Sequence, residues 1–228
     1  MFYGFQNLLS SSSLTLEIVN LLAAGMLMTA LIIQMQRGLT TCVNLYIVQS
    51  FFLALVSFFI AIGFQEGHLM IAAALAILIK VIAIPWMFFW IIKKINIRRE
   101  VQFYLNPSLS LLISGLLVAL SFFIIYRTAI FEGALSKGAV AISLCLVFLG
   151  LFFMISRTKA VTQLVGFLML ENGLFLLANV ATAGVPLVVE VGIFFDVLVL
   201  LIIAGVFVFK MNSTFSHIDV TKLKGLKE

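Results

Sequence analysis

The chain has 228 residues, of which 64% are hydrophobic and 10% are charged, and its formal net charge is +5. Its long apolar runs leave no residues for a charged surface, so this composition excludes a domain that is stable in water alone. The basic residues lie singly or in pairs between apolar runs and mostly on one predicted side of a membrane, which argues against nucleic-acid binding.

Apolar stretches predict the elements in chain order. The length of each stretch is close to the roughly 20 residues that a helix needs to cross about 30 Å of hydrocarbon. They cover 14–36, 43–63, 69–92, 108–126, 138–156, 160–183 and 188–209. Backbone groups in lipid must be paired within the segment, and these runs are too long and uniformly apolar for barrel strands. We therefore predict an all-α fold, a polytopic integral membrane bundle of about seven transmembrane helices in the cell (inner or plasma) membrane.

The lysines and arginines of the loops predict the orientation. Most of them lie on the side opposite the N-terminus, as Arg37, Lys93 and Arg157 do, whereas Arg127 and Lys137 lie on the N-terminal side. By the positive-inside rule the N-terminus is outside and the C-terminus is cytoplasmic. This orientation requires an odd number of helices, in agreement with seven.

A basic loop after the third helix divides the chain, and a weak internal similarity appears across it. Arg37 precedes a helix that carries Gln49-Ser50-Phe51, and Arg157 precedes one that carries Glu171-Asn172-Gly173. We predict a three-helix unit with its basic loop, a linking helix with an external loop, and a second three-helix unit with a basic tail, over 1–107, 108–137 and 138–228. Two unrelated triplets of apolar helices would match equally well.

Two carboxyl groups are predicted to lie deep in the membrane. Glu171 lies near the middle of the sixth stretch, and Asp196 lies in the first half of the seventh. Intramembrane carboxyls commonly serve ion or proton pathways, because desolvation disfavours their charged form. The alternative for both is a hydrogen bond that locks helices together. The amide of Asn172 and the small Gly173 would let Glu171 face another helix instead of lipid.

Lys80 lies about midway along the third stretch, too deep to reach either surface easily. Pro85 follows it, and its missing N–H frees the carbonyl of Val81 and is predicted to bend the helix. The lysine could exchange a proton itself or act on a facing carboxyl. The alternative is a static lysine–carboxylate pair.

The remaining polar positions are predicted to support this chemistry. Gln49 shares a helix face with Tyr46, so it could support a file of water or make a simple interhelical hydrogen bond. Glu190 lies near the outer end of the last predicted helix, where the helix dipole favours a carboxylate. We predict that it is mainly structural, with a proton entry point as the alternative role. Cys42 and Cys145 are isolated, and the chain carries no metal-binding, cofactor-binding or enzyme motif.

These residues carry a family resemblance. The C-terminal part resembles the HyfE family, hydrogenase-4 component E. The resemblance lies in the run Gly166-Phe-Leu-Met-Leu-Glu171-Asn172-Gly173, followed by Val189-Glu190-Val-Gly192, Asp196 and Leu223-Lys224-Gly225. The N-terminal half resembles it too, with Cys42 before Gln49-Ser50 and Lys80-Val81 before Pro85. The last three predicted helices are also similar to the NuoK subunit of respiratory complex I and the MrpC subunit of multisubunit Na⁺/H⁺ antiporters. NuoK uses two intramembrane glutamates for proton transfer, and the resemblance puts Glu171 at the first and Asp196 at or near the second.

The resemblance implies a non-catalytic membrane-arm subunit of a complex-I-like group 4 nickel–iron hydrogenase or formate hydrogenlyase. Its partners would be large antiporter-like subunits, a quinone-site-like membrane subunit and a peripheral hydrogenase module. The nickel–iron centre and the iron–sulfur clusters would belong to those partners, with no cofactor in this chain. The alternatives are a subunit of an Mrp-like cation/proton antiporter, an autonomous ion transporter, or a structural scaffold.

Overall fold

The computed structural model describes residues 12–64, 67–94, 106–128, 131, 133–182 and 205. This part of the chain is helical and contains no β-strand, which confirms the predicted all-α class. The elements are α2 (Ser12–Met35), α3 (Leu39–Phe64), α4 (Gly67–Ala76), the π-helix η1 (Ile77–Ala83), α5 (Ile84–Lys94), α6 (Pro107–Arg127), α7 (Lys137–Ser156) and α8 (Ala160–Thr182).

Within the described residues, 6 segments are long and apolar enough to cross a membrane. Five are single helices, and the sixth, Ala73–Trp90, runs without interruption through α4, η1 and α5. They agree with the first six predicted stretches to within a few residues, so the chain is a multi-pass membrane protein. The seventh stretch, 188–209, lies outside the described residues except for Gly205, and the total of seven and the orientation therefore stay predictions.

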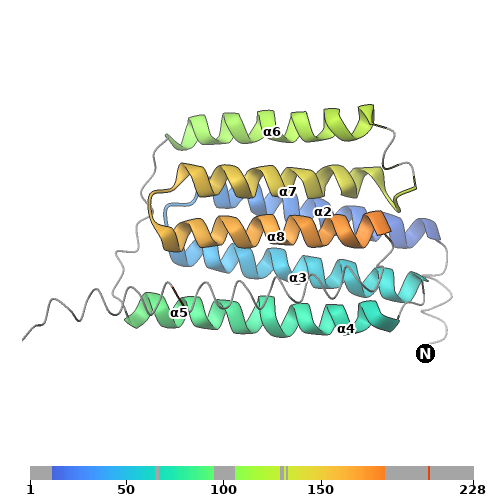
Figure 1. Ribbon diagram of the computed structural model, residues 1–228, viewed down its shortest axis with the longest axis horizontal. Coiled ribbons are helices and arrows are strands. Elements are labelled where there is room, and N and C mark those ends of the chain that lie inside the picture. The colour runs from blue at the N-terminus through green and yellow to red at the C-terminus, as the bar shows by residue number, and fades with distance from the viewer. Residues whose placement is uncertain are drawn as a thin grey trace, which may run out of the picture.

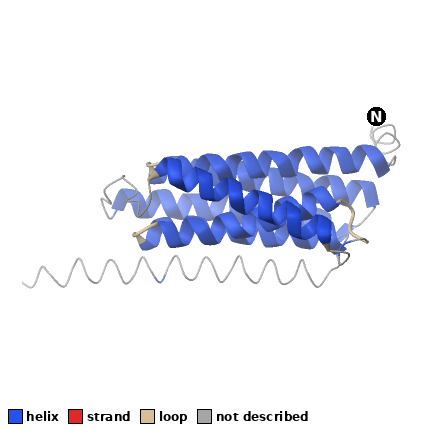
Figure 2. Ribbon diagram, turned by 90° about the horizontal axis from the view of Figure 1, so that it is seen from above, coloured by secondary structure: helices blue, strands red, loops and turns tan. Residues whose placement is uncertain are grey.

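Four helices form the centre of the bundle. Helix α2 packs against α3 and α7, and α8 packs against α7 and α3. Helix α6 covers one side of this group, while α4, η1 and α5 cover α3 on the other side (Figure 1). The axes of all the described helices lie roughly along the long axis of the bundle (Figures 1 and 2). Helix α8 is thus interior, with 67% of its span buried, whereas only 22% of the α6 span is buried.

Small residues bring α7 and α8 into direct backbone contact. A Cβ atom added at Gly150 would lie 2.7 Å from the Gly166 carbonyl oxygen, and one added at Gly173 would lie 2.9 Å from the Ser143 carbonyl oxygen. Membrane helices without a hydrophobic driving force between them gain stability from such close approach. Because Gly173 directly follows Glu171 and Asn172, this contact fixes the rotation and depth of the helix that carries them.

The third span changes its helical geometry next to Pro85. The N–H of Ile84 donates to the carbonyl of Ile79, five residues earlier, which is the hydrogen bond of a π-helix. Proline at 85 has no N–H to give to the carbonyl of Val81, so the regular ladder cannot continue through this point. Lys80 lies at the centre of the resulting wide turn, η1.

Contacts between α3 and α8 follow the internal similarity. Asn172 Nδ2 donates to Ser50 Oγ, and Asn179 Nδ2 donates to Ser57 Oγ; in both pairs the partners are 122 residues apart. Equivalent residues of two copies touch when they lie near a twofold axis. These contacts support a repeated α2–α3 and α7–α8 hairpin. The division into two three-helix units remains a prediction, because 188–209 lies outside the described residues.

Candidate functional site

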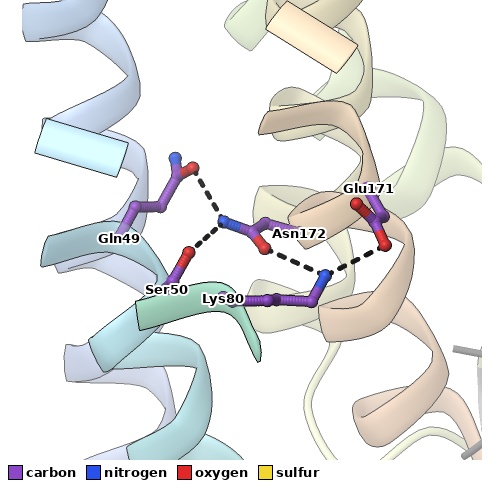
Figure 3. A network of polar contacts seen from close by, with 5 residues as sticks. All are labelled: Gln49, Ser50, Lys80, Glu171 and Asn172. Carbon is purple, nitrogen blue, oxygen red and sulfur yellow. Dashed lines mark hydrogen bonds and ion pairs between the residues drawn. The ribbon is translucent and has the colours of Figure 1, made fainter. Parts of the chain in front are cut away.

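Three spans bring polar side chains together in the middle of the bundle. Glu171 and Asn172 lie at the midpoint of α8, Lys80 lies at the centre of η1, and Gln49 and Ser50 lie near the middle of α3. Figure 3 shows the five side chains directed toward one another. Since each residue is half a span from either end, the site lies near the middle of the hydrocarbon layer.

Lys80 and Glu171 form a buried ion pair. The Lys80 Nζ lies 3.2 Å from Glu171 Oε1, and the two side chains are 0% and 5% exposed. The ammonium also donates to Asn172 Oδ1 at 3.4 Å and lies 5.4 Å from the centroid of the Phe175 ring. A carboxylate, an amide oxygen and an aromatic face replace part of the water that a desolvated ammonium loses. Among the described residues, Lys80 and Glu171 are the titratable ones that were predicted to lie deepest in the membrane, and the structure brings them together.

An amide chain links this pair to α3 and α2. Asn172 Nδ2 donates to Gln49 Oε1 at 3.2 Å and to Ser50 Oγ at 3.1 Å, and Gln49 Nε2 donates to the Met26 carbonyl at 3.2 Å. A side-chain amide accepts on one side and donates on the other. Because both donor contacts of Asn172 lie toward α3, its oxygen is turned toward Lys80 (Figure 3). Gln49 thus makes the interhelical hydrogen bond that was one of its two predicted roles.

Three other residues were predicted to belong to this chemistry, and the structure describes one of them. Tyr46 is fully buried in the hydrophobic core, one helical turn before Ser50. Asp196 and Glu190 lie outside the described residues. Sequence reasoning did not assign Ser50 or Phe175 to the site. Ser50 is equivalent to Asn172 in the internal similarity, and Phe175 lies one turn after Glu171 on the same helix face.

A second buried cation lies at one end of the bundle. Arg157 was counted as a loop charge, but it is 0% exposed at the C-terminus of α7. Its Nη2 donates to the Gln34 carbonyl at 2.8 Å, and its guanidinium lies 4.4 Å from the centroid of the Phe153 ring. Burial lowers the pKa of Arg157 to about 10, against an opposing interaction with Cys42, so the side chain stays charged at neutral pH. A cation there stabilises the C-terminal carbonyls of α2 and α7.

In the part of the chain that the structure describes, no group of three or more His, Cys, Asp or Glu side chains is placed to hold a metal ion. The groups that the described site does hold can exchange protons, at the carboxylate and the ammonium, and can form hydrogen bonds between helices, through the amides.

Comparison with known proteins gives two kinds of relative. An uncharacterised protein of Mycobacterium tuberculosis, Rv0085, is 32% identical over 213 residues, which is 92% of this chain and 96% of that protein. Hydrogenase-4 component E of Escherichia coli K12 and that of Shigella flexneri are each 29% identical over 214 residues, 92% of this chain and 97% of theirs. No family model and no solved structure matches. These matches cover nearly the whole length of hydrogenase-4 component E and support the assignment of the chain to the HyfE family.

Proposed function

We propose that this chain is a non-catalytic membrane subunit of a complex-I-like nickel–iron hydrogenase, such as a formate hydrogenlyase, and that its Lys80–Glu171 pair moves protons. The observation that carries the proposal is the ion pair itself, which is buried in the middle of the membrane spans. Intramembrane ionisable groups are costly to insert, so a pair at this depth favours a role in ion or proton movement. The relatives named hydrogenase-4 component E match over nearly their whole length, which supports the assignment to a hydrogenase complex.

The pair can pass one proton in a closed cycle. A proton from a neighbouring group binds the Glu171 carboxylate, and the Lys80 ammonium, having lost its counterion, releases its own proton to an acceptor on another side. Transfer of the proton from the Glu171 carboxyl to the neutral amine then restores the ionic pair. Desolvation opposes the ionic form of the pair, while the attraction across 3.2 Å favours it.

The catalytic chemistry belongs to partner subunits in this proposal. Large antiporter-like membrane subunits and a quinone-site-like subunit would exchange protons with the pair, and a peripheral module would hold the nickel–iron centre and the iron–sulfur clusters. Asp196 and Glu190, on the predicted seventh helix of the unit 138–228, would extend the path. The principal rival is a static scaffold, which the hydrogen bonds of Asn172 to both Lys80 and α3 favour.

Purification through a C-terminal tag in mild detergent tests the assignment to a complex. Mass spectrometry of the co-purifying chains should find antiporter-like and nickel–iron subunits, and the preparation should evolve hydrogen. A stable chain that purifies alone would contradict the subunit assignment and favour an autonomous transporter.

The Glu171→Gln variant then separates relay from scaffold. Inverted membrane vesicles report proton uptake by quenching of a pH-sensitive dye, and the uptake is divided by the hydrogen evolved in the same sample. A relay predicts that E171Q retains hydrogen evolution with an uncoupler but loses most proton uptake per hydrogen. The matched control is E17Q, which removes an exposed carboxyl of α2 and should leave the ratio unchanged. An unchanged ratio in an assembled E171Q complex would favour the scaffold.

A further inference from the structure

The ammonium of Lys80 occupies the position of a bound cation in an oxygen-lined site. Glu171 Oε1 and Asn172 Oδ1 both face Nζ, at 3.2 and 3.4 Å, and the Phe175 ring lies on a third side. We infer that Lys80 is a tethered cation that takes the place of a metal ion, and that this makes the site handle protons and exclude Na⁺. This inference rests on the proposed function, because it names the ion that the same pair handles.

Two oxygen atoms face the ammonium, one from a carboxylate and one from an amide. Carboxylate and amide oxygens are the ligands of hard cations in proteins. The Asn172 oxygen cannot turn away from Lys80 without breaking hydrogen bonds, because the amide nitrogen of the same side chain donates to Gln49 Oε1 and Ser50 Oγ. The site is therefore held in a cation-binding geometry from the α3 side, and the lysine side chain enters it from η1 (Figure 3).

Charge balance explains the exclusion of Na⁺. Of the five side chains in Figure 3, Glu171 is the acidic one, and its single charge is already matched by Lys80. A second cation about 4 Å from the ammonium would bind roughly 1,000-fold more weakly, by the repulsion expected at an effective dielectric constant near 20. A proton avoids this repulsion, since it neutralises the carboxylate or leaves the ammonium and adds no second ion to the site.

The first measurement uses the wild-type complex. Proton uptake per hydrogen evolved is recorded in inverted vesicles in sodium chloride and in sodium-free choline chloride. The inference predicts a ratio that differs by less than about 1.2-fold between the two salts. A ratio that falls several-fold without sodium would overturn the inference and would leave the proposed role in ion movement standing.

The second measurement compares Lys80→Ala with Lys80→Met in the purified complex. Alanine opens the volume of the lysine side chain beside Glu171 and Asn172, whereas methionine fills most of it without a charge. Methylammonium chloride should raise the thermal unfolding midpoint of the K80A complex, by about 3–6 °C at ten times the dissociation constant and with the logarithm of its concentration above that. The K80M and wild-type complexes should show no such rise.

The outcomes separate the inference from the proposed function. No rise of the midpoint in K80A with methylammonium, or an equal rise in K80M, would overturn the tethered-cation site whatever the transport assays give. If E171Q keeps full proton uptake per hydrogen, the proposed function fails, and binding of methylammonium to K80A still reports on the site. If K80A does not assemble, the comparison of salts in the wild-type complex decides the inference.

Discussion

Removing each partner of the Lys80–Glu171 pair in turn has an energetic cost that can be worked from the geometry. Lys80→Met leaves a buried carboxyl without the ammonium 3.2 Å away, and Glu171→Gln leaves a buried ammonium without its carboxylate. Breaking a buried pair in this way costs about 3–5 kcal/mol. The remaining group can instead become neutral. At pH 7 this costs roughly 3.7 kcal/mol for a glutamate of solution pKa about 4.3, and roughly 4.6 kcal/mol for a lysine of solution pKa about 10.4. Neutralisation therefore limits either loss to about 4–5 kcal/mol.

The two single variants should respond to pH in opposite directions. When the carboxyl of K80M is neutral in the folded chain, the folded state holds a proton that the unfolded state releases above pH about 4.3. The free energy of unfolding then falls by up to about 1.4 kcal/mol per pH unit as the pH rises. In E171Q the folded chain holds a neutral amine and the unfolded chain is protonated, so the free energy of unfolding rises with pH toward about 10.4. The double variant K80M/E171Q has neither group and should show no slope beyond that of the wild-type chain.

Thermal stability in detergent gives the measurement. Solubilised membranes with a fluorescently tagged chain are heated between pH 5.5 and 9, and the monodisperse fraction is measured by size-exclusion chromatography. Since about 1 kcal/mol corresponds to roughly 2–4 °C in a chain of this size, each slope should approach about 3–6 °C per pH unit. The exposed Lys93 and Glu17 provide the controls K93M and E17Q, which should show no added slope relative to the wild-type chain. Slopes of the same sign, or a double variant as unstable as the sum of the singles, would refute an isolated pair.

Three further variants test the supports of the site. Asn172→Ala should destabilise the chain by about 1–3 kcal/mol and lower proton uptake per hydrogen, whereas the control Asn179→Ala should cost a similar amount of stability and keep the ratio. Gly150→Val should abolish assembly on a blot of solubilised complexes, because its Cβ would lie 2.7 Å from the backbone of α8; Gly115→Val, with nothing within 4 Å, should assemble normally. Arg157→Gln should lower the free energy of unfolding by about 1.5–3 kcal/mol in the same thermal assay, and Arg157→Lys should recover part of it; equal losses would refute the guanidinium's contact with α2.

The spans could be predicted closely because the bilayer sets both their length and their apolarity. The depth of Lys80 and Glu171 followed from the same argument, since each lies near the middle of its span. Their pairing could not be predicted, because depth does not say which helices are neighbours. Contact between α7 and α8 at Gly150 and the packing of η1 beside α3 decide that.

Local geometry escaped prediction where it depends on the packing of other helices. Pro85 signalled an interruption of the hydrogen-bond ladder, but the wide turn of η1 around Lys80 is a structural result. Arg157 looked like a loop charge because it lies between two apolar runs. It is buried because the end of α2 supplies a carbonyl 2.8 Å from its guanidinium. The sequence around α7 and α8 does not reveal that the end of α2 lies there.

The predicted internal repeat offers an explanation for the single charge pair. Ser50 and Asn172 are in contact, and in the predicted repeat Gln49 and Glu171, which precede them, occupy equivalent positions in α3 and α8. One copy carries an amide and the other a carboxylate of similar size. Two carboxylates there would face one ammonium, and a second buried negative charge without a partner would cost several kcal/mol. Gln49 instead holds Asn172, which directs its oxygen to Lys80. The asymmetry between the two copies thus gives one helix the titratable group and the other the group that positions it.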